Sequence, residues 1–161
     1  MSSALHIHLA DRHSTYRCAG AEHTLPVGSA TLAALLTADP PPPEDLTNAI
    51  GLLADHLEDV VREVPASGAA EEILIHGPGL ATLVAVEVGA PTPLPYTLDR
   101  PTAEEVFRTL ATEPSAARRL NPGLPAEEVH SVLGVSCAVV ALLRRLDHTE
   151  LTVVAVAEAG N

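Results

Sequence analysis

The chain has 161 residues, of which 47% are hydrophobic and only 2% aromatic, and its formal net charge is −12. This length suits a single domain over residues 1–161 with an aliphatic core, and the hydrophobic content excludes disorder for most of the chain. Acidic residues outnumber basic ones 21 to nine, so the surface repels nucleic acid and anionic membranes. We therefore expect neither as a partner.

The cysteines and the apolar segments indicate the compartment. Cys18 and Cys137 are far apart in the sequence, which predicts two buried, reduced thiols and a cytoplasmic protein. The N-terminal residues do not have the pattern of a signal peptide, and the apolar run 132–143 is too short to span a membrane.

The first part of the sequence predicts strands followed by helices. Leu5, Ile7 and Leu9 alternate with His6 and His8, which indicates a strand with two faces. Proline residues then end one helix, and an acidic turn begins a long amphipathic one. These two strands and two helices are expected over residues 15–19, 22–27, 29–37 and 43–64.

The second part predicts one buried strand, several helices and a closing strand. The run Glu72 to His76 is the buried strand, and it ends at Gly77-Pro78-Gly79. Thr102 with Glu105 has the pattern of a capping box, which begins a helix. Further helices are expected over residues 80–88, 114–120 and 125–146, and a strand over 151–157. The predicted fold is α/β, with a five-stranded mixed sheet flanked by helices.

Four segments in this order resemble a known family. They are Thr24–Leu32, the proline-rich step with the long helix after it, Arg118–Pro125, and Glu150–Val153. Each is similar to a segment of the second (C-terminal) lobe of the exopolyphosphatase/guanosine-pentaphosphate phosphatase (Ppx/GppA) family. The resemblance implies a ribonuclease-H-like lobe of the actin and hexokinase type. It also implies a stand-alone lobe, without the preceding lobe that carries a catalytic carboxylate in the family.

The first phosphate loop of that family is altered here. The family's Asp-Ile-Gly-Gly-Gly-Ser-Thr run falls on residues 9–15, so Asp11, Arg12 and His13 replace three glycines. Their β-carbons block the approach of an anion to the backbone amides. Asp11 adds a like charge, worth roughly 4 kcal/mol at about 4 Å and an effective dielectric near 20. The resemblance therefore implies a degenerate lobe that has lost the hydrolysis of polyphosphate or pppGpp.

The second phosphate loop, near residues 75–80, has lost its hydroxyl, and Pro78 lacks an amide hydrogen. If the first and fourth strands are adjacent and parallel, His76 lies beside the first loop at the rim of the sheet. There His13 or His76 could act as a base, oriented by Asp11. Ordinary solvated turn residues are the alternative. The expected ligand contacts are Arg12, Ser14, Thr15, Gly77 and Gly79.

His6 and His8 are a second candidate site, because alternate strand residues share a face and could bind zinc together with Asp11 or His13. Two histidines on one strand are a weak metal signal, and a pair facing a helix or a subunit contact is the preferred interpretation. We expect no metal and no cofactor.

Three functions fit the sequence. The first is a noncatalytic lobe that binds or assembles, as a homo-oligomer or with a separate partner lobe, because a lobe without its neighbour exposes apolar surface. The second is a repurposed biosynthetic enzyme acting on a small molecule through the altered loops. The third is one half of a split phosphohydrolase, for which support is weakest because both loops are changed. The sequence slightly favours the first.

Overall fold

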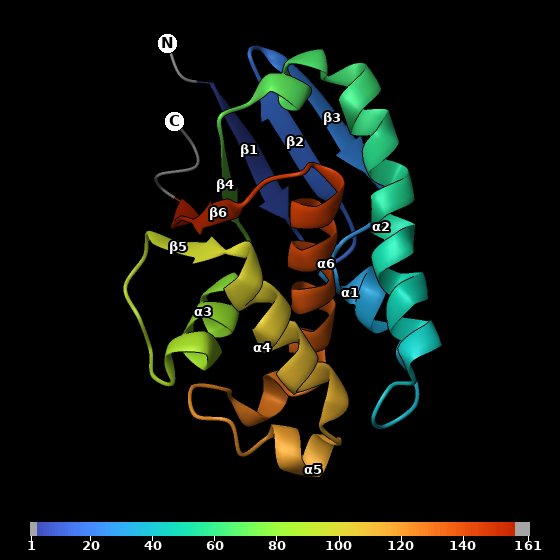
Figure 1. The fold of residues 1–161 in the computed structure, drawn as a ribbon, viewed down its shortest axis with the longest axis vertical. Helices are drawn as coiled ribbons and strands as arrows, with labels where there is room; N and C mark the ends of the chain where they lie inside the picture. The colour runs from blue at the N-terminus through green and yellow to red at the C-terminus, as the bar shows by residue number, and fades with distance from the viewer. Residues whose placement is uncertain (1–2, 157–161) are drawn as a thin grey trace.

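A computed structural model describes residues 3–156, in which six strands form one mixed sheet (Figure 1). The strands are β1 (Ala4–Leu9), β2 (Ser14–Cys18), β3 (Ala21–Leu25), β4 (Glu72–His76), β5 (Tyr96–Asp99) and β6 (Glu150–Val153). Their order across the sheet is β3-β2-β1-β4-β6-β5. Strands β1, β4 and β6 are parallel, whereas β2, β3 and β5 run antiparallel to their neighbours.

The helices form a layer beside the sheet. They are α1 (Ser29–Ala33), α2 (Pro43–Glu63), α3 (Leu80–Val88), α4 (Arg100–Thr112), α5 (Ser115–Arg118) and α6 (Ser131–Arg145). Helix α6 is central in this layer and packs against α1, α2 and α4 (Figure 1). Because it has neighbours on several sides, it is buried from Val132 to Leu143, as its apolar sequence predicted.

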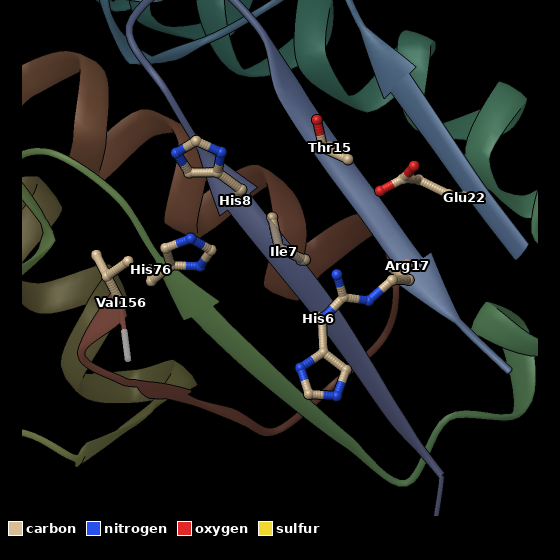
Figure 2. A pocket seen from close by; sticks show the side chains of 8 residues that line it. All are labelled: His6, Ile7, His8, Thr15, Arg17, Glu22, His76 and Val156. Carbon is tan, nitrogen blue, oxygen red and sulfur yellow. The ribbon is translucent and has the colours of Figure 1, made fainter. Parts of the chain in front are cut away.

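The two faces of the sheet differ in what covers them. Leu5, Ile7 and Leu9 of β1 are fully buried on the inner face, where the apolar side of α2 also packs. His6 and His8 lie on the outer face and are only half-buried. The helices lie behind the sheet when it is viewed from this outer face (Figure 2). The fold is therefore two-layered, and its hydrophobic core lies on one side of the sheet.

The prediction of five strands was wrong by one. Tyr96–Asp99 forms β5, which pairs antiparallel with β6, with Thr97 opposite Thr152. This segment has only four residues and follows the prolines at 91–95, so its sequence has almost no local strand signal. It becomes a strand because β6 offers a free edge with which its backbone groups can pair.

Several helix boundaries also differ from the prediction. Helix α4 begins at Arg100, and the side chain of Asp99 caps it by accepting a 2.8 Å hydrogen bond from the Thr102 amide. The helix expected over 125–146 is divided into a 3-10 turn, Ala126–Glu128, and α6. Helix α1 ends at Ala33, earlier than expected. The last strand was expected to reach Ala157, which lies outside the described residues.

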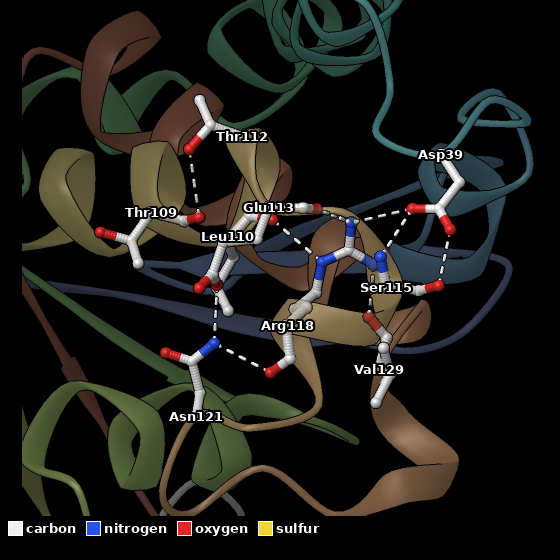
Figure 3. Close-up of polar contacts among 9 residues, drawn as sticks. All are labelled: Asp39, Thr109, Leu110, Thr112, Glu113, Ser115, Arg118, Asn121 and Val129. Atoms are coloured by element: carbon white, nitrogen blue, oxygen red, sulfur yellow. Dashed lines mark hydrogen bonds and ion pairs between the residues drawn. The ribbon is translucent and has the colours of Figure 1, made fainter.

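One charged side chain, Arg118, is buried between the helices and is 2% exposed. Its guanidinium donates hydrogen bonds to the backbone carbonyls of Leu110 (2.9 Å), Val129 (3.0 Å) and Glu113 (2.7 Å) (Figure 3). Asp39 lies 3.9 Å away, and its carboxylate accepts hydrogen bonds from Ser115. Arg118 thus joins α4, α5 and the segment that leads into α6.

Both cysteines are buried free thiols, as predicted. Burial raises the pKa of Cys137 to about 12, so this thiol is neutral at physiological pH. No helix within residues 3–156 combines the length and the apolar character needed to cross a membrane.

Candidate functional site: a histidine face on the open side of the sheet

A pocket of about 330 Å³ lies on the outer face of the sheet. Figure 2 shows that its walls come from β1, β2, β3 and β4 and from the residues after β6. We call this surface the histidine face. Its lining residues are His6, Ile7, His8, Thr15, Arg17, Glu22, His76 and Val156.

The alternation of side chains along the strands builds this face. His6 and His8 share the side of β1 opposite to its buried leucines. Strands β1 and β4 are adjacent and parallel, as the sequence predicted, and their register places His8 opposite His76. The period of two along each strand therefore gathers the imidazoles without any special loop.

The rings of His8 and His76 are stacked, with centroids 4.5 Å apart and planes inclined by 10°. The ring of His13 meets His8 edge-on, with centroids 6.0 Å apart. Burial, followed by the neighbouring His8 ring, lowers the pKa of His76, while the backbone of Ile7 acts in the opposite direction. His76 is therefore mainly neutral near pH 7.

Two ring nitrogens in the pocket lack protein partners. Nδ1 of His6 and Nδ1 of His76 are shielded from solvent, and neither makes a hydrogen bond within the described structure. The Nε2 atoms are therefore the ring nitrogens that a ligand would contact.

Opposite the imidazoles, β2 and β3 contribute polar groups. Arg17 extends from β2 toward His6, and Glu22 on β3 is its cross-strand partner in the register (Figure 2). The hydroxyls of Thr15 and Thr24 are 3.0 Å apart and hydrogen-bonded. Thr15, which was predicted as a ligand contact, does line the pocket.

The β1–β2 turn, Ala10–His13, directs its carbonyl oxygens at the start of α1. The Ala10 carbonyl accepts from the amide of Ser29 at 3.0 Å. The Asp11 carbonyl accepts from the amides of Ala30 at 2.8 Å and Thr31 at 3.2 Å. The first amides of α1 are thus already bonded to the turn, and the turn does not form a nest of amides for an anion.

The structure separates the residues that the sequence placed in one acid–base site. Asp11 and Arg12 are exposed on the turn, and within residues 3–156 no hydrogen bond or ion pair joins either of them to His13 or His76. Asp11 therefore does not orient an imidazole. The rings of His13 and His76 each contact the ring of His8, which stands between them.

Ser14 was expected to contact a ligand, but it is fully buried on the inner face. Its hydroxyl donates to the carbonyl of Val27 at 2.8 Å and is 2.9 Å from the hydroxyl of Tyr16. A ligand on the histidine face cannot reach it.

Gly77 and Gly79, also predicted ligand contacts, are required by close packing. A β-carbon at Gly77, whose φ is +143°, would lie 2.0 Å from the carbonyl oxygen of Leu9. One at Gly79, with φ +88°, would lie 2.7 Å from the side chain of Val135. The close contacts and the positive φ values together account for glycine at both positions.

The suggested zinc site is not preformed. In the part of the chain that the structure describes, no group of three or more His, Cys, Asp or Glu side chains is arranged to hold a metal ion. The rings of His8 and His76 are also stacked in parallel, so their edges lie side by side and do not converge on one metal position. His6 and His8 face the open side of the sheet, so within residues 3–156 they do not face a helix, which was one expectation for this pair.

Sequence reasoning did not include Arg17 and Glu22 in the site. The signal was present, because Arg17 is two residues after Thr15 on a predicted strand and therefore shares its face. Glu22 requires the register of β2 with β3, which pairs it with Arg17. That register depends on the short turn at Ala19–Gly20, where both residues have positive φ.

Comparisons with known proteins find the fold but no sequence relative. No family model and no curated protein matches the sequence. An exopolyphosphatase-like protein is similar in structure, with a TM-score of 0.86 and 17% identity over 95% of this chain and 54% of the other. The Aquifex aeolicus Ppx/GppA phosphatase gives 0.80 at 17% identity, covering 95% and 53%. An exopolyphosphatase from Cytophaga hutchinsonii gives 0.71 at 14%, also covering 95% and 53%.

The fold is thus that of a single lobe of Ppx/GppA structures. The chain spans about half the length of the structures that it matches. The resemblance noted in the sequence is confirmed at the level of fold, and the sheet has one strand more than expected.

Proposed function

We propose that this chain is a Ppx/GppA-like lobe without phosphohydrolase activity of its own, which acts as a binding module through its histidine face. The observation that carries this proposal is the direction of the Ala10–His13 turn. Its carbonyls are bonded to the amides of α1, so the backbone presents acceptors where an anion cradle needs donors. The side chains of Asp11, Arg12 and His13 add bulk at the same place.

The binding role is supported by the pocket on the histidine face. This pocket is far larger than the about 10–15 Å³ that one water molecule needs, and imidazole and guanidinium groups line it. A repurposed enzyme has less support, because within residues 3–156 no hydrogen bond joins Asp11 to His76 and no carboxylate is bonded to either His8 or His76. A binding module needs only the pocket and its donors.

Phosphate release is the test. We expect the purified chain to release no orthophosphate above the buffer blank from polyphosphate or pppGpp with Mg²⁺ present. The Cytophaga hutchinsonii exopolyphosphatase is the positive control for the polyphosphate assay. The chain in which Asp11, Arg12 and His13 are all replaced by glycine should also stay inactive, because the carbonyls of the turn still bond to α1. Steady release that scales with the concentration of the unmodified chain would contradict the proposal.

A further inference from the structure

We propose that the ligand of the histidine face is a small organic anion, a carboxylate or a phosphate ester, whose charged group is bound by the imidazoles and Arg17 and whose binding takes up a proton. This inference rests on the proposed binding function and specifies the chemistry of its ligand. It concerns the open face of the sheet and not the altered phosphate loops.

The distribution of charge is the first argument. In a chain of net charge −12, four of the eight histidines, His6, His8, His13 and His76, gather at this face. The histidine face thus concentrates nitrogen donors on a surface that is otherwise acidic, which favours a negatively charged ligand.

The arrangement of donors is the second argument. Because Nδ1 of His6 and of His76 is shielded, their Nε2 atoms are left to meet a ligand. Arg17 approaches from β2 on the other side of β1, and a guanidinium can donate two hydrogen bonds to one carboxylate or phosphate. Val156 adds an apolar side chain at the edge of the pocket. The pocket therefore has donors for an anionic group and an apolar contact for the rest of a small molecule.

The stacked rings are the third argument, because they link binding to protonation. Two imidazolium rings in parallel contact would repel each other, and burial together with the His8 ring lowers the pKa of His76 in the ligand-free chain. A bound anion offsets this repulsion and raises the pKa of His76. The titratable and charged groups of the neighbouring elements are His6 on β1, Arg17 on β2, Glu22 on β3, and His13 at the turn, where Asp11 and Arg12 are exposed.

The sign of the pH dependence follows from this coupling. An anion that prefers protonated His76 binds most tightly below the pKa of that ring, and its affinity falls as the pH rises through that pKa. The pKa of the unbound His76 lies below the ordinary value of 6.5, so most of the gain in affinity occurs on the acidic side of neutrality. We expect the affinity to rise by about ten-fold or more between about pH 8 and about pH 5.5.

The experiment is calorimetric titration of the full chain with succinate and with inorganic phosphate, at constant ionic strength in buffers of different ionisation enthalpy. Binding with proton uptake is expected. His76→Gln and His6→Gln should each weaken it by about ten-fold, since each removes a donor to a charged group. His56→Gln, on α2 and away from this face, should change the affinity by less than about two-fold. Preference for succinate or for phosphate identifies the source of the anionic group.

Several outcomes would overturn the inference. They are no binding of either anion at about pH 6, binding by the His76→Gln and His6→Gln variants that is as tight as that of the unmodified chain, and affinity that grows with pH. Histidine NMR titration of the unmodified chain provides a check that needs no variant, because a saturating anion should raise the pKa of His76. The phosphate-release assay keeps the two proposals apart. An inactive chain without an anion site contradicts only this inference, whereas an active phosphatase contradicts the proposed function.

Discussion

Replacing Arg118 by alanine is expected to lower the free energy of unfolding by about 3–5 kcal/mol. The guanidinium donates to the carbonyls of Leu110, Val129 and Glu113, and the arginine side chain is 2% exposed. Alanine leaves three largely buried acceptors without their donor, and each such acceptor costs about 1–3 kcal/mol. Urea denaturation followed by circular dichroism measures the change.

Arg119 provides a matched control for this experiment. It is the next residue in the chain, it is exposed, and alanine there should alter stability by less than about 0.5 kcal/mol. Lysine at 118 should give an intermediate loss, because an ammonium group cannot reproduce the planar fork of donors. Equal stability of the variants at 118 and 119 would show that the three carbonyls find water instead, and would remove this role of Arg118.

Gly134→Ala is expected to destabilise the protein by about 2 kcal/mol or more, because α1 and α6 touch at this glycine. A β-carbon at Gly134 would lie 2.0 Å from the carbonyl oxygen of Ser29 and 3.0 Å from the amide nitrogen of Ala33. Both are backbone atoms and cannot rotate away, so one helix must shift. The measurement is again the midpoint and slope of urea denaturation.

Gly51→Ala is the opposite case on another helix. Gly51 lies within α2, and a β-carbon there would have no neighbour within 4 Å. The substitution should stabilise the chain by about 0.5–1 kcal/mol, which is the helix preference of alanine over glycine. The same substitution in two helices should therefore have opposite signs. Unchanged or higher stability of Gly134→Ala would show that the α1–α6 contact is not the reason for glycine at 134.

The parts of the fold that sequence reasoning predicted are those with a local signal. The alternation Leu5-His6-Ile7-His8-Leu9 identified β1 and its two faces, and the apolar spacing after Pro43 identified α2. The family resemblance singled out the segment Arg118–Pro125. The structural role of Arg118, a guanidinium buried against backbone carbonyls, depends on contacts among α4, α5 and α6 that no local sequence pattern contains.

The candidate site was only partly predictable for a related reason. The pairing of β1 with β4 was expected and is observed, and the rings of His13 and His76 each contact the ring of His8. Sequence reasoning did not predict that His76 points to the outer face of the sheet. Ile73 and Ile75 point into the core, so the period of two along β4 places His76 on the opposite face. The exposed position of Asp11 and Arg12 could not be predicted, because it depends on hydrogen bonds between the turn and α1.

The one-sided packing of the sheet has an evolutionary consequence. Residues that hold the molecule together point inward from each strand, while those that would meet a ligand point outward from the same strands. Substitution of His6, His8 or Thr15 therefore leaves the buried leucines and isoleucines untouched. Related chains can drift in what they recognise on this surface while keeping an unchanged scaffold, so their specificities should diverge faster than their folds.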